Sequence, residues 1–411
     1  MGRKRQIWTG SWEYKEGLVI NLSLFTIGVF LEYFTSGGGV LSLMQYPFNL
    51  YFLGALIIAL FVLWFAFRNT AFTQWLGSIP GAISAISLFL FMGLIMGFTL
   101  QTHETEPTFL HNIGFTHISS SWPYMFSILL LLLSLGITCL KNLIPLNRKR
   151  LGFTISHLGL FIVIASANFG GTQLQRLEMR LQEGRIVTYA TNKSDNQVYN
   201  LPFAIKLKDF ILEEYNPKLT IVNNNTGELM HGNGKNIVII DSSMECSMMD
   251  YHIKVEEYIE SSAKAGSKYY FNNESGSSPA ALLSVILNDT AKVVGWISCG
   301  SYNKPYESLK LDSLYSLVML FPEPKLFVSE IQIFNQSGEI TNAKLEVNKP
   351  FEYDDFKIYQ LNYDSNLGKW SDVSIIELIY DPWLPYVYFG ILLMILGAFY
   401  MLWRGATKKN V

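Results

Sequence analysis

The sequence has few charged residues, which make up 16% of its 411 positions against about 25% in soluble globular proteins. Half of the residues are hydrophobic and 14% are aromatic. The deficit is uneven, because residues 1–170 and 384–403 are apolar with short polar breaks, whereas residues 171–383 have the composition of a soluble domain. This division excludes an ordinary soluble protein and favours a membrane protein that carries one large polar domain.

Cysteine is also scarce, and the three cysteines form no CxxC motif, so the sequence offers no obvious active site for a thiol-exchange enzyme. Cys246 and Cys299 both lie in the polar region, and the sequence leaves open whether they form a disulfide. The chain also lacks a phosphate-binding glycine loop, an HExxH or GxSxG motif and a zinc-type cysteine cluster. No catalytic group is predicted.

Six apolar stretches are long enough to cross a hydrocarbon core, which takes about 20 helical residues. The first is not expected to be a cleavable signal peptide, because it has no small-residue cleavage site and a second apolar run soon follows. The six predicted spans lie near residues 17–36, 49–67, 81–100, 123–140, 152–170 and 384–403.

The distribution of Lys and Arg in the short loops predicts the orientation of these spans. The loops at 32–48 and 101–122 contain neither residue. The basic residues lie in the other flanks, at Arg3, Lys4, Arg5, Lys15, Arg68, Lys141, Arg148, Lys149, Arg150, Arg404, Lys408 and Lys409. Both termini are therefore predicted to be cytoplasmic, and residues 171–383 extracytoplasmic, in a multi-pass protein of the cytoplasmic (inner) membrane.

Alternating apolar residues in the polar region predict β-strands. Residues 325–334 and 343–347 flank the turn sequence NQSGE and are predicted to form a hairpin. Residues 355–363 and 371–380 predict a second hairpin, and a short helix is predicted near 278–288. The predicted fold is a polytopic α-helical membrane protein of six spans, with a mainly-β, sandwich- or barrel-like domain before the last span.

The polar region holds 19 Lys and Arg against 28 Asp and Glu, which gives it a net charge of −9. Such a surface argues against nucleic acid as a partner. It is compatible with a basic protein partner, although solvated acidic surfaces are common.

His157 stands alone in the apolar run FTISHLGLFIVIAS, residues 153–166. It lies about 10 Å into the predicted span at 1.5 Å per residue, in its cytoplasmic half, where a polar side chain needs a protein partner. One interpretation is a neutral ring that hydrogen-bonds a neighbouring helix, through Ser156 or Thr154. The other is an axial ligand to haem iron. Small residues nearby would let a flat macrocycle or another helix approach closely: Ser156, Gly159 and Ala165.

The segment HLGLFIVIASANFGG, which begins at His157, resembles the third transmembrane segment of ResB-like (CcsB-type) proteins, subunits of the System II cytochrome c maturation machinery. The resemblance covers roughly residues 81–403. Other similar segments follow the family's order along the chain, at 115–142, 177–189, 201–210, 345–364 and 381–403.

This resemblance implies a non-catalytic subunit of a complex that exports haem and attaches it to apocytochrome c. By position, His157 is the residue implied as an axial ligand in the membrane, with a second histidine from a CcsA- or ResC-type partner. The implied cargo is haem b, which the partner presents in reduced form to the CxxCH motif of the apocytochrome, where two thioether bonds form.

Two features depart from the family pattern. The usual core has four spans, whereas this chain adds two at its front, and it lacks the tryptophan-rich external segment of the partner subunit. The predicted division is two additional spans (1–70), a ResB-like core of three spans (71–170), the β-rich domain (171–383), and the last span with its tail (384–411).

Three histidines in the loop 101–122 are weaker candidates for a metal or haem site: His103, His111 and His117. Glu104 and Glu106 in the same loop favour a solvated segment, and in the family the external ligands belong to the partner.

Two other functions remain open. A cytochrome b-type electron-transfer subunit normally needs paired histidines within its spans, and only His157 is available here. A membrane-anchored extracytoplasmic chaperone for apocytochrome would need no haem ligand at all.

Overall fold

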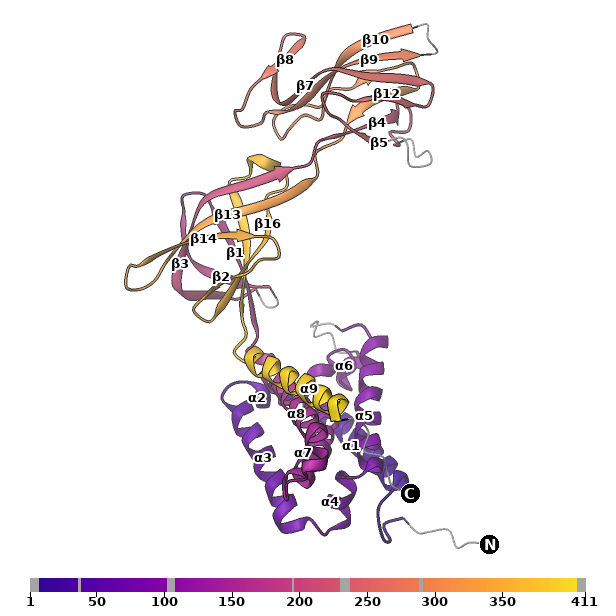
Figure 1. The fold of residues 1–411 in the computed structure, drawn as a ribbon, viewed down its shortest axis with the longest axis vertical. Helices are drawn as coiled ribbons and strands as arrows, with labels where there is room; N and C mark the ends of the chain where they lie inside the picture. Colours follow the sequence, from indigo (N-terminus) through magenta and orange to yellow (C-terminus); the bar gives the residue numbers. More distant parts are fainter. Residues whose placement is uncertain are drawn as a thin grey trace. The chain divides into compact units, whose positions relative to one another are not determined.

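The computed structural model describes residues 7–35, 38–101, 108–193, 196–229, 237–287 and 291–404. The chain forms two compact units (Figure 1), one made of Met1–Gln175 with Tyr380–Val411 and the other of Arg176–Ile379. The first unit is helical and the second consists of β-sheets.

Within the described residues, six helices of the first unit are long and apolar enough to cross a membrane, and they confirm the six apolar helices predicted from the sequence. They are α1 (Tyr14–Thr35), α3 (Phe48–Phe67), α5 (Ile79–Phe98), α7 (Trp122–Leu143), α8 (Leu151–Gly170) and α9 (Leu384–Arg404). Shorter helices lie between them, namely α2 (Gly38–Met44), α4 (Ala71–Leu76) and α6 (Phe109–Asn112).

Helix α7 is the most buried of the six and packs against α1, α3, α5 and α8. The two N-terminal spans contact it closely. A Cβ atom at Gly28 of α1 would lie 2.7 Å from the Cα of Pro123, and one at Gly136 of α7 would lie 2.6 Å from a methyl group of Leu60 on α3. The additional spans are therefore built into the helix bundle.

Helices α8 and α9 pack through two pairs of glycines. A Cβ atom at Gly159 would lie 2.5 Å from the carbonyl oxygen of Gly390, and one at Gly397 would lie 2.6 Å from that of Gly152. The same Gly397 position approaches the backbone nitrogen of Ser156 to 2.5 Å. The small residues Ser156 and Gly159 thus allow α9 to pack closely against α8, as small residues commonly do between membrane helices.

The β unit contains an eight-stranded sheet around one apolar core. Its order is β14 (Ile340–Glu346), β13 (Pro324–Phe334), β3 (Val198–Glu214), β2 (Ile186–Asn192), β1 (Gln175–Gln182), β17 (Val373–Tyr380), β16 (Phe356–Tyr363) and β15 (Phe351–Tyr353). The sheet curls like a barrel, because β14 at one end contacts β15 and β16 at the other.

Two further sheets share a second core and form a sandwich. One has the order β10 (Ala291–Ser298), β9 (Ser278–Leu287), β7 (Tyr251–Ala265) and β6 (Glu245–Met248), with β8 (Lys268–Phe271) paired to β7. The other has the order β11 (Leu309–Lys310), β12 (Tyr315–Met319), β4 (Lys218–Asn223) and β5 (Ile237–Ile239). The large β-rich domain before the last span is thus confirmed.

Both predicted hairpins are present, as β13–β14 and β16–β17. The short helix predicted near 278–288 is wrong, because these residues form strand β9 between β7 and β10. Ala280, Ala281 and Leu283 are fully buried there. A strand covered on both faces is a continuous apolar run, and periodicity cannot distinguish such a run from a buried helix.

Candidate functional site

His157 lies on α8 with its ring half-buried. Its Nδ1 is 2.9 Å from the carbonyl oxygen of Phe153, one turn earlier on the same helix. A carbonyl oxygen only accepts hydrogen bonds, so Nδ1 carries the proton, and in the neutral ring Nε2 then carries the lone pair. The Phe153 ring also packs on the imidazole, with 3.7 Å between the ring centroids. These two contacts fix both the tautomer and the ring orientation.

The imidazole faces a cavity of about 510 Å³, which we call the His157 cavity. This volume lies within the range of about 300–1,000 Å³ that is common for cofactor and small-molecule sites. Its walls are mainly apolar and come from α5, α7 and α8, including Ile79, Ile86, Leu131, Leu135, Leu160 and Ile164. Among its described lining residues there is no second histidine and no cysteine or methionine.

Two cations line the same cavity at the end of the bundle where α7 ends and α8 begins. Lys141 donates to the carbonyl oxygen of Gly77 at 3.2 Å, and Arg150 directly precedes α8. Neither cation forms an ion pair within the described part of the chain. The cavity therefore combines apolar walls, one imidazole with an available lone pair, and positive charge at one end.

The predicted hydrogen bond from His157 to a neighbouring helix is not seen among the described residues. The Thr154 hydroxyl donates instead to the carbonyl oxygen of Arg150 at 3.0 Å, and Ser156 faces α9. The His157 bond stays within its own helix. Sequence alone did not show this, because which side of α8 faces α9 depends on the glycine pairs that the two helices share.

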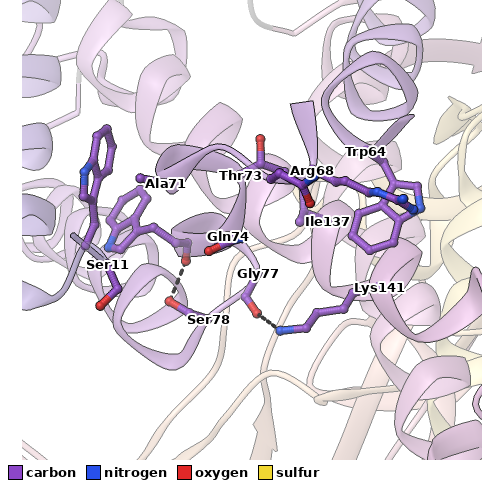
Figure 2. A pocket seen from close by; sticks show the side chains of 13 residues that line it. Ser11, Trp64, Arg68, Ala71, Thr73, Gln74, Gly77, Ser78, Ile137 and Lys141 are labelled. Carbon is purple, nitrogen blue, oxygen red and sulfur yellow. Dashed lines mark hydrogen bonds between the residues drawn. The ribbon is translucent and has the colours of Figure 1, made fainter. Parts of the chain in front are cut away.

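A second cavity of about 500 Å³, which we call the basal cavity, adjoins the first. Figure 2 shows the side chains that line it, with Lys141 directed at the Gly77 carbonyl. The Ser78 hydroxyl donates to the Trp75 carbonyl oxygen at 2.6 Å. Gly77, Ser78 and Lys141 line both cavities. Arg68, at the end of α3, lines the basal cavity but not the His157 cavity.

The outer-loop histidines were weaker candidates for a ligand role. His103 lies outside the described residues. His111 and His117 lie together, with 4.7 Å between their ring centroids, and both contact the hydroxyl of Thr116. The Nε2 atom of His117 is 2.9 Å from Oε1 of Glu32. The structure thus brings two of the three histidines together, and a ligand role for them stays a prediction.

Glu32 is a further candidate functional residue, which the sequence analysis did not identify. It is fully buried on α1, and its second oxygen accepts the backbone N–H of Trp122 at 2.9 Å. Trp122 is the first residue of α7, where a carboxylate is favoured by the helix dipole. The preceding Ser121 makes no capping bond with its own side chain. The sequence signal that could have identified Glu32 is a single acidic residue within an apolar span.

Replacing Glu32 with alanine should lower the stability of the helical unit by several kcal/mol. The change leaves the His117 ring and the Trp122 amide without their acceptor, at about 1–3 kcal/mol for each buried unsatisfied group. Thermal unfolding of the purified protein in detergent measures the effect. The matched control is Glu245→Ala, which removes a contact of the same 2.9 Å length to His252 between exposed side chains and should have little effect. Equal losses in both variants would contradict the role given to Glu32.

Cys246 and Cys299 are free thiols in the structure, so the disulfide that the sequence left open is not present there. Both pack against the core of the sandwich. Burial raises the pKa of the Cys299 thiol to about 12 and also raises the pKa of Cys246 above its usual range. Both are therefore protonated at neutral pH and are poor nucleophiles.

The described residues contain six helices of membrane-spanning length and an antiparallel β unit before the last of them, which indicates a multi-pass membrane protein. A histidine lines a cavity between α5, α7 and α8, which makes this cavity a candidate ligand site. A comparison with protein families matches residues 308–375 to the ResB-like family. No curated protein matches the sequence.

The family match confirms the resemblance found in the sequence and points to a role in cytochrome c biogenesis. The matched residues run from β11 into β17, in the second half of the β unit. His157 lies outside the matched range, so its role is argued from the geometry of the site.

Proposed function

We propose that this protein is the haem-handling subunit of a cytochrome c maturation complex, and that His157 supplies one axial ligand to haem b in the membrane. The observation that carries the proposal is the hydrogen bond from Nδ1 of His157 to the Phe153 carbonyl, which leaves Nε2 without a partner within the helix, on a ring that lines the cavity. Histidines that bind metals usually donate their other ring N–H to a carbonyl or carboxylate in this way.

The rest of the His157 cavity also fits haem. Its apolar walls suit the faces of a porphyrin, and Lys141 and Arg150 supply positive charge for two propionates at one end. A neutral imidazole is a common axial ligand of haem iron. The cavity would hold the cargo against loss into lipid and would keep water from its faces.

The distribution of basic residues supports an orientation with this end of the bundle in the cytoplasm. Arg404 donates to the carbonyl oxygen of Arg148 at 2.8 Å, so the start of the tail lies beside the loop between α7 and α8. We propose that haem enters near this end and that the β-rich domain lies on the extracytoplasmic (periplasmic) side. There the partner would attach haem to the CxxCH motif of apocytochrome c.

A partner subunit is part of the proposal, because one described histidine in the cavity supplies only one of two axial bonds. A CcsA- or ResC-type membrane protein would supply the second histidine. The contribution of this chain is binding and positioning, and no catalytic group of its own is invoked.

The purified protein by itself should therefore retain little haem, whereas co-expression with a CcsA-type partner should yield a complex with a strong Soret band. The measurement is the visible spectrum of each preparation at equal protein concentration. A strong six-coordinate spectrum from the isolated chain would contradict the shared-ligand arrangement. A haem-free complex that still matures cytochrome c would favour an apocytochrome chaperone instead.

A further inference from the structure

The basal cavity has no counterpart in the function proposed so far, although its size is close to that of the His157 cavity. It is built largely from segments next to the two additional N-terminal spans. Trp12 precedes α1, Trp64 lies on α3, and Arg68 follows α3. Trp75 of α4 and Lys141 of α7 also line the cavity.

The residues that line the basal cavity favour a planar, negatively charged ligand. The half-buried indoles of Trp12 and Trp64 line the cavity together with two cations, and none of its described lining residues is acidic. Neither Arg68 nor Lys141 has a carboxylate partner within the described ranges. Guanidinium and ammonium groups without a carboxylate partner favour carboxylates or phosphates of a ligand, and indole faces favour planar rings.

The indole of Trp12 is held in place before any ligand arrives. The Trp75 side chain is almost completely buried, and its ring nitrogen donates to the carbonyl oxygen of Glu13 at 3.3 Å. The Trp12 ring packs against Trp75 at 6.3 Å and against Phe72 at 5.9 Å, measured between centroids. An aromatic wall that is already fixed costs little conformational entropy when a planar ligand binds.

We propose that the basal cavity is a receiving site for the anionic porphyrin, occupied before the His157 cavity. This inference rests on the proposed haem-handling function. It assigns the additional spans a role, which is to extend the binding surface of the bundle at its basic end. An anionic lipid headgroup would share the attraction to Arg68 and Lys141, but a headgroup has no planar ring to match the indoles of Trp12 and Trp64.

Lys141 connects the two sites, because its side chain lines both cavities. A propionate bound by Lys141 in the basal cavity can keep this contact while the ring moves toward His157. Arg68 contributes to the first site only, so substitutions at Arg68 separate reception from axial ligation.

The test uses iron-free protoporphyrin IX, which has the planar ring and both propionates but no iron for His157 to bind. It is titrated into the purified full-length protein in nanodiscs of neutral lipid, and binding is followed by quenching of tryptophan fluorescence. The Arg68→Gln variant should bind about tenfold more weakly, as expected for the loss of one charge-assisted contact. Arg68→Lys, which keeps the charge, should bind within about twofold of the unmodified protein.

Two controls define the specificity of this result. Lys149→Gln removes an exposed cation that lines neither cavity and should leave binding unchanged. The dimethyl ester of protoporphyrin, which lacks both charges, should bind weakly and should not respond to Arg68→Gln. Arg68 is itself exposed, so its replacement is not expected to disturb folding.

Equal affinity of the unmodified protein and Arg68→Gln for the diacid porphyrin would overturn the inference. The inference would also be overturned if Arg68→Gln bound less phosphatidylglycerol in mixed nanodiscs while its porphyrin affinity stayed unchanged. That result would assign the cavity to a lipid headgroup. The proposed function is tested separately. If His157→Ala keeps its haem ligation while Arg68→Gln weakens porphyrin binding, the axial role of His157 fails and the receiving site stands.

Discussion

Replacing His157 with alanine should abolish haem binding by the complex and stop cytochrome c maturation, while the protein stays inserted and abundant. Alanine is the best helix former and removes a polar group that is costly in a membrane. The ring bonds within its own helix, to Phe153, so its loss leaves no group on a neighbouring helix without a partner. A histidine that bonded a neighbouring helix would instead contribute about 1 kcal/mol to helix packing.

Added imidazole distinguishes a lost ligand from a damaged fold. A vacated axial position at residue 157 can be filled by free imidazole, which should restore a haem spectrum to the alanine complex. The measurements are the visible spectrum of the purified complex, with and without imidazole, and the yield of a reporter cytochrome c. His252→Ala is the matched control, because that histidine lies partly exposed in the β unit and pairs with Glu245.

Normal haem content and normal maturation in the His157→Ala complex would refute the ligand assignment. The hydrogen bond to Phe153 would then be a local feature of α8, and the cavity would need another occupant. Loss of haem that imidazole does not restore, together with a lower yield of protein, would place the defect in folding.

Replacing Gly159 with leucine should destabilise the helical unit strongly. A Cβ atom alone at this position would lie 2.5 Å from the carbonyl oxygen of Gly390, so a leucine side chain must push α8 and α9 apart. Overpacking a close contact typically costs about 1–3 kcal/mol, and a contact between two backbones has little room to adjust. Because α8 also carries His157, we expect haem retention by the complex to fall together with stability.

Thermal unfolding in detergent and the yield of folded protein measure this effect. Gly93→Leu on α5 is the matched control, because a Cβ atom there would meet no atom within 4 Å. The control should unfold close to the unmodified protein. An unchanged unfolding temperature for Gly159→Leu would mean that α8 and α9 do not need their close approach.

The sequence by itself determined the six spans and much of the β-rich domain. Span length follows from the thickness of the hydrocarbon core, and an apolar run of that length needs no tertiary partner to be recognised. The hairpin of β13 and β14 was equally legible, because alternating apolar residues flank NQSGE and the strands are neighbours in the chain. The family resemblance also came from the sequence, and the match at residues 308–375 confirms it.

Only the tertiary structure decided which residues meet. Glu32 and His117 are 85 positions apart, and neither local pattern indicates the other. The basal cavity joins Trp12 to Lys141 through four separate segments. Strand β9 shows no alternation in the sequence because it is buried on both faces, so its apolar run predicts a helix as readily as a strand.

The candidate site itself depended on both levels. His157 was singled out from the sequence, because an ionisable ring in an apolar span is expensive and needs a reason. Helix packing then determines where the His157 ring lies. The glycine pairs set which side of α8 faces α9, and His157 lines the cavity that α8 forms with α5 and α7. Local patterns specify elements, whereas the contacts between distant elements are set by the shapes that pack together, and those shapes exist only in the folded chain.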